Sequence, residues 1–254
     1  MFTVSRQIDE TSSIKTVRFK EGLAATPGQF VMMWVPGVDE FPMSVSYSAN
    51  GLGITYQVLG DGTKALASKV QGDRIGIRGP YGKGFAIHGK HLLVVAGGAG
   101  MAPLAPFVEE AVTHKASVDL VIGARTSSNI LFESRGVRAG AKVHISTDDG
   151  TKGFKGLAVE LAESVLASGK FDSIYACGPE KMLLGLLRIA ESRRLPMQAS
   201  LERIMKCGIG VCDSCAIDGK HVCTDGPVFS ECDLRAFGEL AKTKLDMCGR
   251  KVPV

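Results

Sequence analysis

The cysteines constrain this 254-residue chain more than any other residue type. Six of the seven lie in the last 48 residues, and three of these fall within nine residues, in "MKCGIGVCDSC" at 205–215. The total is odd, and the N-terminal stretch "MFTVSRQIDETSS" has no basic region followed by an apolar core, so neither disulfides nor secretion is expected. Thiols clustered in this way are typical of a metal site.

The spacing of four of these thiols narrows the choice of metal. They follow the pattern C-x4-C-x2-C-x7-C and are Cys207, Cys212, Cys215 and Cys223. C-x4-C-x2-C followed by a further Cys is the plant-type 2Fe–2S arrangement, whereas structural zinc sites usually come as two close pairs separated by a longer loop. A thioredoxin-type disulfide is disfavoured, because that motif opens a helix in a βαβ unit. The pattern therefore favours a 2Fe–2S cluster over zinc.

The other nucleophilic or metal-binding side chains give weaker patterns. Cys232 and Cys248 have no partner at a suitable spacing, so both are expected to be packed thiols. The histidines form no cluster along the chain: His88, His91, His114, His144 and His221. Because no acid–base or nucleophile constellation is evident, no catalytic residue is assigned and the chemistry is left to cofactors.

Composition and charge exclude several classes of function. Hydrophobic residues make up 45% of the chain and charged residues 22%, as in ordinary globular proteins. The net charge of +4 is too mild for nucleic-acid binding, which usually uses a concentrated basic stripe. Residues 92–108 are uncharged, but glycines and prolines interrupt them and a membrane helix needs about 20 apolar residues. We expect a soluble, cytoplasmic protein that binds neither nucleic acid nor membrane.

Three segments of the chain differ in pattern. Residues 1–89 contain short runs separated by Gly, Pro, Asn and Asp, which predicts an antiparallel barrel or sandwich. Residues 90–198 alternate strands with helical stretches, which predicts a doubly wound α/β domain. Residues 199–254 are rich in cysteine and poor in apolar runs, so their metal centre is expected to hold them together. The predicted fold class is multidomain: a β-barrel, an α/β domain and a small cluster domain.

Two glycine turns in the second segment indicate a nucleotide site. "GGAGMAP" (97–103) follows a strand at the entry to a helix, where backbone N–H groups can bind a pyrophosphate. It is not the G-x-G-x-x-G fingerprint, so a plain tight turn is the alternative. "CGPEKM" (177–182) follows another strand, whose carboxyl end would face the ligand crevice. The residues predicted to bind NAD(H) are Gly97, Gly98, Gly100, Cys177, Gly178 and Pro179.

The first segment contains three stretches that indicate a flavin when they precede a nucleotide domain. They are "FPMS" (41–44), "TYQVLGDGTKAL" (55–66) and "GPYGKGF" (79–85). Gly60, Gly62 and Thr63 form a polar turn before a short helical run, which is able to hold a phosphate through N–H groups and a hydroxyl. Taken alone, each stretch favours a hairpin turn, and only the order of the three ahead of a nucleotide domain indicates a flavin.

Together these motifs resemble the iron–sulfur electron-transfer subunit of class 1B dihydroorotate dehydrogenase, in the ferredoxin–NAD(P)H reductase superfamily. The resemblance runs nearly end to end, and its specific part is the cysteine loop followed by "CTDGPVF" (223–229). It implies FAD on the barrel, NADH on the α/β domain and a 2Fe–2S cluster bound by the four cysteines. It also implies a separate FMN-bearing catalytic subunit, in a heterotetramer, that oxidises dihydroorotate to orotate in pyrimidine synthesis.

The resemblance further implies which residues contact FAD. Those along the flavin would be Phe41, Pro42, Met43, Ser44, Thr55, Tyr56 and Gln57, and those at its phosphates Gly62 and Thr63. The chain departs from the family at Phe41, because the family's motif usually begins with arginine, as R-P-x-S. We expect Lys64 or Arg78 to supply the missing positive charge. The hairpin between Cys215 and Cys223 is also shorter than in the family.

Two other functions compete with this one. The first is a flavin and iron–sulfur subunit of a sulfide dehydrogenase or NAD(P)H transhydrogenase complex. Such relatives tend to replace one cluster cysteine by aspartate, and the presence of four cysteines here favours the dihydroorotate dehydrogenase subunit. The second is a zinc-stabilised binding module without a redox role.

Overall fold

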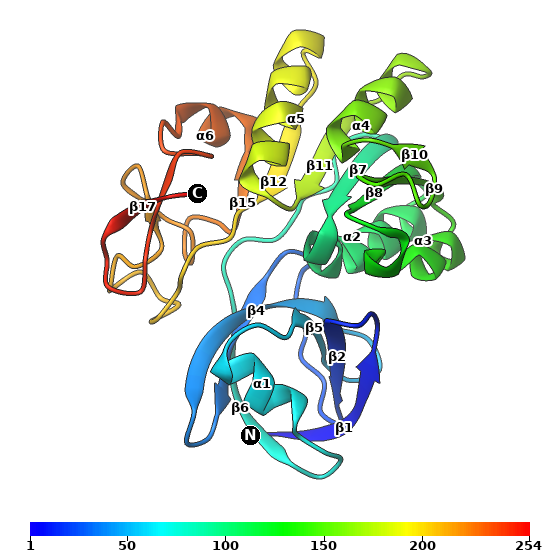
Figure 1. Cartoon of the computed structure of the whole chain (residues 1–254). Coiled ribbons are helices and arrows are strands. Elements are labelled where there is room, and N and C mark those ends of the chain that lie inside the picture. The colour runs from blue at the N-terminus through cyan, green and yellow to red at the C-terminus, as the bar shows by residue number, and fades with distance from the viewer.

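A computed structural model describes residues 1–254, which form a barrel, an α/β unit and a C-terminal region (Figure 1). The barrel is closed and antiparallel, with the strand order β1-β2-β5-β4-β3-β6. Helix α1 (Asp61–Ala67) lies between β5 and β6 in the chain. The barrel strands are β1 (Phe2–Asp9), β2 (Ile14–Phe19), β3 (Phe30–Val35), β4 (Asp39–Tyr47), β5 (Gly53–Gln57) and β6 (Arg74–Tyr81). The predicted antiparallel barrel is confirmed.

Side chains alternate between the inside and the outside of the barrel along each strand. In β3, Val31 and Met33 belong to the barrel core, whereas Met32 is buried against the C-terminal region. In β4, Met43 and Val45 pack in the barrel core, so Pro42 and Ser44 lie on the outer face. The outer face of β3 and β4 is therefore the barrel surface that meets the rest of the molecule.

The α/β unit contains a seven-stranded sheet with the order β10-β9-β8-β7-β11-β12-β15. All neighbouring strands are parallel except β12 and β15, which are antiparallel. The strands are β7 (His91–Gly97), β8 (Ser117–Ala124), β9 (Lys142–Thr147), β10 (Phe154–Lys155), β11 (Ser173–Cys177), β12 (Met197–Ser200) and β15 (Val228–Ser230). The helices are α2 (Met101–Thr113), α3 (Glu133–Ala139), α4 (Ala158–Ala167) and α5 (Glu180–Arg193).

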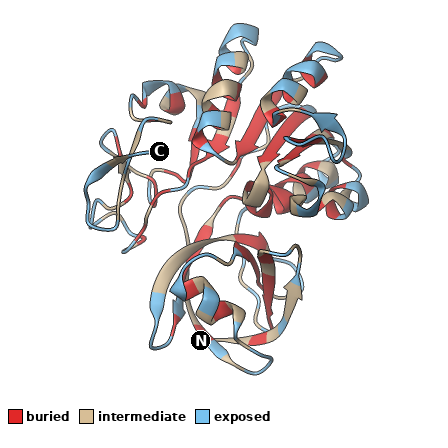
Figure 2. Ribbon diagram, in the orientation of Figure 1, coloured by how far each residue is buried: buried red, intermediate tan, exposed pale blue.

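Helices cover both faces of this sheet, and for that reason its central strands are largely buried (Figure 2). In β7, Leu93 and Val95 belong to the core cluster that includes residues of α4 and α5. Leu92 and Val94 of the same strand belong to the cluster that includes residues of α2 and α3. The predicted doubly wound domain is confirmed.

The C-terminal region has little core of its own. Its short elements are β13 (Ala216–Ile217), β14 (Lys220–His221), α6 (Glu231–Ala236), β16 (Thr243–Leu245) and β17 (Lys251–Pro253). The buried side chains of Met205, Ile217 and Val222 join the same core cluster as α4 and α5. Its strand β15 completes the edge of the α/β sheet beside β12. The predicted boundaries at 89/90 and 198/199 stay predictions, and the second of them falls within β12.

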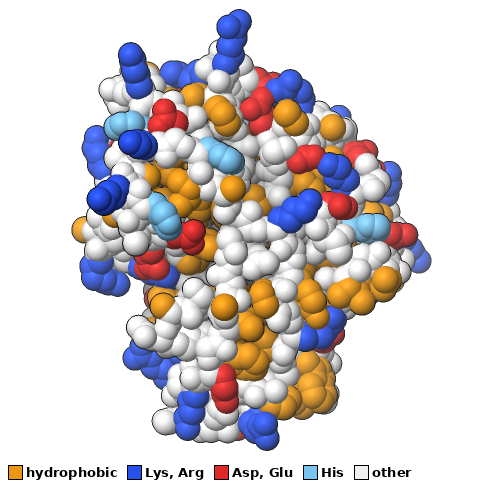
Figure 3. All heavy atoms as spheres, turned by 180° about the vertical axis from the view of Figure 1, so that it is seen from behind, with side chains coloured by type: hydrophobic (Ala, Val, Ile, Leu, Met, Phe, Trp, Pro, Cys, Tyr) orange, Lys and Arg blue, Asp and Glu red, His pale blue; other side chains and the backbone are white.

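Apolar side chains also reach the surface of the molecule. On the face opposite to that of Figure 1, hydrophobic side chains gather on the barrel lobe, with Lys and Arg around the edge (Figure 3). Among the exposed apolar residues of the barrel are Trp34 and Val38, whose exposed fractions are 46% and 51%. None of the helices has the length and the apolar content needed to span a bilayer.

Candidate cofactor sites

The two predicted nucleotide loops lie side by side at the carboxyl edge of the sheet. Strands β7 and β11 are neighbours, and Ala96 pairs with Cys177 at their ends. From β7 the chain passes through α2 to β8, which lies on one side of β7, whereas β11 lies on the other side of β7. The direction of the strand order therefore reverses between β7 and β11. This is the position at which open α/β sheets bind ligands. The structure thus brings the six predicted nucleotide residues together.

The backbones of these loops are in direct contact. A Cβ atom on Gly100 would lie 2.2 Å from the carbonyl oxygen of Cys177, and one on Gly97 would lie 2.7 Å from Cδ of Pro179. Only glycine fits at such approaches. The 13-residue helix α2 begins directly after this turn, at Met101, so its free N–H groups and positive dipole end point to the same place. The arrangement suits a pyrophosphate.

Cys177 itself is a buried, uncharged side chain. Burial raises the pKa of its thiol far above the usual range, and the negative charge of Glu202 adds to the shift. A hydrogen bond with Ser200 opposes this rise without cancelling it. The Cys177 side chain is therefore a buried neutral thiol beneath the two loops and is not a thiolate nucleophile.

Strand β4, which carries the predicted flavin motif, lies between the nucleotide turn and the cysteine loop. On one side, β4 contacts α2, and β5 contacts the turn at Gly98–Gly100. On the other side is β3, where a Cβ atom on Gly208 would lie 3.0 Å from Cγ of Met32. Because Pro42 and Ser44 face outward from β4, they look onto the junction of the three regions. A flat cofactor on this face would lie between the nucleotide turn and the cysteines.

The remaining predicted flavin residues have more varied surroundings. Thr55 lies on the outer face in a buried hydroxyl network, with its Oγ1 2.8 Å from Oγ1 of Thr16 and 2.8 Å from Oγ of Ser46. Tyr56 points into the barrel core, and its hydroxyl donates to Oε1 of Gln7 at 3.1 Å. Gln57, the last residue of β5, is exposed. The side chains of Thr55 and Tyr56, neighbours on β5, therefore point to opposite sides of the barrel wall.

The predicted phosphate turn packs against the residue that replaces the family's arginine. A Cβ atom on Gly62 would lie 2.5 Å from Cε1 of Phe41, so the aromatic ring covers this glycine. The hydroxyl of Thr63 accepts the N–H groups of Leu59 at 2.9 Å and Gly60 at 3.1 Å. Contact with the Phe41 ring and the hydrogen bonds of the turn are therefore enough to explain why glycine and threonine occupy positions 62 and 63, apart from any role in binding phosphate.

The two candidates for the missing positive charge differ in position. Lys64 is largely exposed and lies 3.8 Å from Asp61. Arg78 lies on β6 beside Met32 of β3, and it forms a fork with Glu40, with Nε–Oε1 at 2.7 Å and Nη2–Oε2 at 3.0 Å. The hydrogen bonds with Glu40 raise the pKa of Arg78 well above its ordinary value. Of the two, Arg78 faces the strand that carries the flavin motif.

The cysteine loop aims backbone donors at Cys207. Its Sγ accepts the N–H groups of Ile209 and Val211, each at 3.4 Å. Gly208 and Gly210 have φ angles of 73° and 78°, a conformation that favours glycine. Burial raises the pKa of Cys207, but hydrogen bonds from Ile209, Val211 and Cys212 outweigh it and lower the pKa to about 6. A thiolate that accepts N–H groups is a suitable iron–sulfur ligand.

The four thiols differ in exposure. Cys207 is partly exposed and Cys212 is exposed in the loop, whereas Cys215 and Cys223 are buried around the hairpin of β13 and β14. Burial raises the pKa of Cys223 to about 12, and the hydrogen bond with Cys215 adds to this rise. No group of three or more His, Cys, Asp or Glu side chains could hold a single metal ion. Four cysteine thiolates are the usual ligand set of a 2Fe–2S cluster, so the residues present fit this group.

The prediction that Cys232 and Cys248 are packed thiols is wrong, because both are exposed. Cys232 lies in the short helix α6, which buries Leu234 instead. Cys248 lies in the turn between β16 and β17, where its N–H donates to Oδ1 of Asp246 at 2.8 Å. Neither lies in the cysteine loop.

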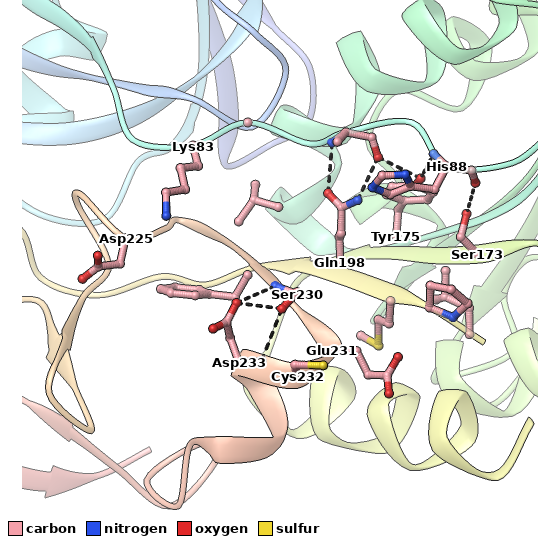
Figure 4. A pocket seen from close by; sticks show the side chains of 17 residues that line it. Lys83, His88, Ser173, Tyr175, Gln198, Asp225, Ser230, Glu231, Cys232 and Asp233 are labelled. Atoms are coloured by element: carbon pink, nitrogen blue, oxygen red, sulfur yellow. Dashed lines mark hydrogen bonds between the residues drawn. The ribbon is translucent and has the colours of Figure 1, made fainter. Parts of the chain in front are cut away.

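A cavity of about 430 Å³ lies at the opposite edge of the sheet from the nucleotide loops (Figure 4). Its lining includes Ser173, the first residue of β11, whereas Cys177 ends that strand. The amide of Gln198 bonds both the N–H and the carbonyl of Ala86, at 3.0 and 2.8 Å, and the hydroxyl of Tyr175 donates to the same carbonyl. These polar groups join the linker after the barrel to the sheet. None of the residues predicted to bind FAD, NAD(H) or the cluster lines the cavity.

Two buried charged residues near the predicted sites are not singled out by any sequence pattern. Glu180 begins α5 directly after the second nucleotide loop, and Arg203 precedes Cys207 by four residues. Their side chains are 9% and 1% exposed, and they form an ion pair with each other. The only sequence signal is their place beside "CGP" and before the cysteine loop.

Two protein-family models match parts of the chain. Residues 94–186 match an oxidoreductase NAD-binding domain, and residues 202–235 match the iron–sulfur cluster binding domain of dihydroorotate dehydrogenase B. The first range contains both nucleotide loops, and the second contains all four clustered cysteines.

Several relatives match over nearly their whole length. A protein of Methanocella arvoryzae, described as a probable dihydroorotate dehydrogenase B (NAD(+)) electron transfer subunit, is 45% identical and covers 98% of this chain and 96% of its own. A protein of Methanocaldococcus jannaschii with the same description is 42% identical, covering 96% and 95%. Among solved structures, an NADH-dependent reduced ferredoxin–NADP oxidoreductase has a TM-score of 0.82 at 24% identity, covering 94% and 93% of the two chains. That structure supports the fold.

Proposed function

The chain belongs to the family of dihydroorotate dehydrogenase B electron transfer subunits, and from this premise we propose that it carries electrons between NAD(H), FAD and a 2Fe–2S cluster. The electrons pass to or from an FMN-bearing catalytic subunit, which oxidises dihydroorotate in pyrimidine synthesis. The assembly is proposed to be a heterotetramer of the two subunits. A nicotinamide delivers two electrons as a hydride and a 2Fe–2S cluster takes one at a time, so FAD supplies the conversion between them.

The observation that carries this proposal is the position of β4. Its outer residues Pro42 and Ser44 face the junction at which the nucleotide turn and the loop of Cys207 approach the barrel from opposite sides. This arrangement supports a site for FAD between the sites proposed for the nicotinamide and the cluster. The protein contributes position and electrostatics to the transfer, in agreement with the lack of an acid–base constellation.

The chain's own residues have distinct roles in this proposal. Backbone N–H groups at Gly98–Gly100 and the start of α2 bind the pyrophosphate of NAD(H), and Gly178 and Pro179 let the nicotinamide approach the barrel. On the barrel, FAD would be held along the outer side of Phe41–Ser44 and Thr55–Gln57, where Pro42, Ser44 and Thr55 face outward, and Gly62 and Thr63 would meet its phosphates. Arg78 would approach the same face from β6, with its guanidinium paired with Glu40.

The cysteine loop is suited to exchange with a protein partner. Cys215 and Cys223 are buried, whereas Cys212 is exposed and Cys207 is partly exposed, so one side of the cluster would approach the surface. The neighbouring side chains on this side are apolar: Ile209 and Val211 are 52% and 74% exposed. An apolar rim with an electron carrier behind it fits the approach of the catalytic subunit.

The alternative functions are less well supported. The relatives described above carry the name of the dihydroorotate dehydrogenase B subunit, and the match at residues 202–235 is to the cluster domain of that enzyme. A structural zinc site usually has two close pairs of ligands separated by a longer loop, whereas three of these thiols fall within nine residues.

The proposal is tested by co-expressing the chain with a candidate FMN subunit and measuring dihydroorotate-dependent reduction of NAD+. We expect activity only when both chains are present, with FAD, iron and labile sulfide in the complex. Cys223→Ser should abolish the activity, and Cys232→Ser, in the same region but outside the cysteine loop, should leave it unchanged. A colourless, anaerobically purified chain without iron and sulfide would contradict the redox function.

A further inference from the structure

The buried ion pair of Glu180 and Arg203 connects two regions with different cofactors. Glu180 is the first residue of α5, immediately after the nucleotide loop at Cys177–Pro179. Arg203 lies between β12 and the cysteine loop, four residues before Cys207. In Figure 1, α5 stands directly beside the C-terminal region. The pair therefore joins the end of the nucleotide loop to the start of the cluster segment.

The geometry of the pair is a fork that leaves little freedom. Nη1 and Nη2 of Arg203 donate to the two carboxylate oxygens of Glu180, the second at 3.2 Å, and Nη1 also donates to the carbonyl of Glu202 at 2.9 Å. The carboxylate further accepts the N–H of Ala241 at 2.8 Å. Glu180 thus joins three pieces of chain: α5, the segment before the cysteine loop and the segment before β16.

An ion pair is an expensive way to fill this space if stability alone matters. Two charges lose their hydration on burial, and similar volumes of apolar side chain often stabilise a protein equally well or better. Nε of Arg203 is moreover buried without any hydrogen-bond partner. A bidentate fork does provide fixed distance and direction, which apolar contacts do not. The arrangement of the pair therefore points to control of position.

We propose that Glu180 and Arg203 are positioning residues that fix the cluster segment against the nucleotide loop. This inference rests on the proposed function, because it assigns the pair to the transfer between FAD and the cluster. It predicts that loosening the pair affects the cluster side of the protein, while the transfer from NADH to FAD is retained. It also predicts that binding of NAD+ at the nucleotide loop changes the hydrogen exchange of the segment at 203–215.

The chain offers a matched control for this pair. Arg135 and Glu109 form a second fork, with Nε–Oε1 at 2.7 Å and Nη2–Oε2 at 2.8 Å; the arginine is buried, with Nη1 also without a partner, whereas the Glu109 side chain is 44% exposed. This fork joins α3 to α2, and its guanidinium lies 3.7 Å from the ring centre of Tyr47 in the barrel. Like the first fork it holds a buried arginine by two contacts with a glutamate, but it has no link to the cluster segment.

The experiment compares Arg203→Gln with Arg135→Gln in the complete complex. Backbone hydrogen exchange is measured for residues 203–223, with and without NAD+, and the absorbance of FAD and of the cluster is followed separately after mixing with NADH. For Arg203→Gln we expect exchange in 203–215 to rise at least tenfold and cluster reduction to slow by about tenfold or more, since small displacements in a reaction centre have effects of this size. FAD reduction should stay within about twofold of the wild type.

In the wild type, NAD+ should lower exchange at 203–215, and this protection should be lost in Arg203→Gln but kept in Arg135→Gln. If Arg203→Gln does not fold, the double variant Glu180→Leu/Arg203→Met replaces it, because apolar residues of similar volume restore stability. The double variant should still show raised exchange and slow cluster reduction. Wild-type exchange and cluster reduction in whichever variant folds would overturn the inference, and so would equal slowing of both transfer steps.

Failure of the proposed function gives a different result. Wild-type complex without FAD, without iron or without reduction by NADH would contradict the proposed function. The exchange measurements would then still decide whether the pair fixes the cluster segment, because they do not depend on the redox reaction.

Discussion

The barrel and the C-terminal region show two opposite ways of ordering a chain. The six strands of the barrel close on one another, and their inward side chains form a separate core cluster of 12 buried residues. In the C-terminal region the strands are two or three residues long, and the buried side chains belong to the cluster of the α/β unit. The barrel is therefore ordered by its own sequence, whereas the C-terminal region is ordered by what it contacts.

Three kinds of contact order the C-terminal region. Strand β15 pairs with β12 of the α/β sheet, the carboxylate of Glu180 accepts hydrogen bonds from Arg203 and from the N–H of Ala241, and the proposed cluster would join the four thiols. Because this region does not depend on a large apolar core of its own, it can hold a cofactor close to the surface. The difference predicts that damage to the C-terminal region stays local, while damage to the barrel core spreads through the barrel.

The largest effect is expected from removing a cluster ligand. Cys223→Ser should abolish binding of iron and labile sulfide and leave residues 205–225 without protection from hydrogen exchange, because ligand binding contributes directly to folding in small metal-bound regions. The barrel should keep wild-type protection. Iron and sulfide analysis with hydrogen exchange checks this, and Cys232→Ser is the control. Loss of protection in the barrel of Cys223→Ser would remove the contrast between the two regions.

A pair of core substitutions tests the same contrast from the packing side. Ile54 in the barrel and Ile217 in β13 are both fully buried, so replacement of either by alanine should cost about 2–5 kcal/mol of local stability. Ile54→Ala should weaken FAD retention and leave iron in place, whereas Ile217→Ala should lower iron content with FAD retained. Cofactor content after dialysis measures both. Simultaneous loss of both cofactors in each variant would show that the regions unfold as one unit.

The nucleotide loops should respond to a single methyl group. Gly100→Ala places a Cβ 2.2 Å from the carbonyl of Cys177, so the two loops must separate. We expect affinity for NAD+ to fall at least tenfold, about 1.4 kcal/mol, with FAD and iron unchanged. Titration calorimetry measures the affinity. Gly22→Ala, where no atom lies within 4 Å of the new Cβ, is the control and should bind NAD+ like the wild type.

Features with a periodic or spaced pattern were predictable from the sequence. The alternating runs at 1–89 predicted the barrel, and the cysteine spacing predicted the loop in which Cys207 accepts backbone N–H groups. The burial of Cys232 was predicted wrongly, because a six-residue helix gives no clear apolar face. The pair of Glu180 and Arg203 could not be predicted, since residues 23 positions apart meet only after β12 and α5 have packed. Long-range pairing of single charges leaves no periodic trace.

The smallest predicted effect concerns Tyr56 in the barrel, and it depends on pH. Burial raises the pKa of Tyr56 to about 12, partly offset by its hydrogen bond with Gln7. The unfolded phenol has a pKa of about 10, so Tyr56 contributes its full stability below pH 10 and loses it as the pH rises towards 12. Tyr56→Phe should cost about 0.5–1.5 kcal/mol at pH 7 through the lost hydrogen bond.

Between pH 10 and 12 the barrel of the wild type should therefore lose stability more steeply than that of Tyr56→Phe, by up to about 1.4 kcal/mol per pH unit. Urea unfolding of the two proteins at several pH values measures the difference, with hydrogen exchange reporting the barrel separately from the other regions. The C-terminal region contains no tyrosine and should show the same pH dependence in both proteins. Equal slopes for the two barrels would mean that Tyr56 ionises in the folded state as readily as in the unfolded chain, which would contradict its place in the barrel core.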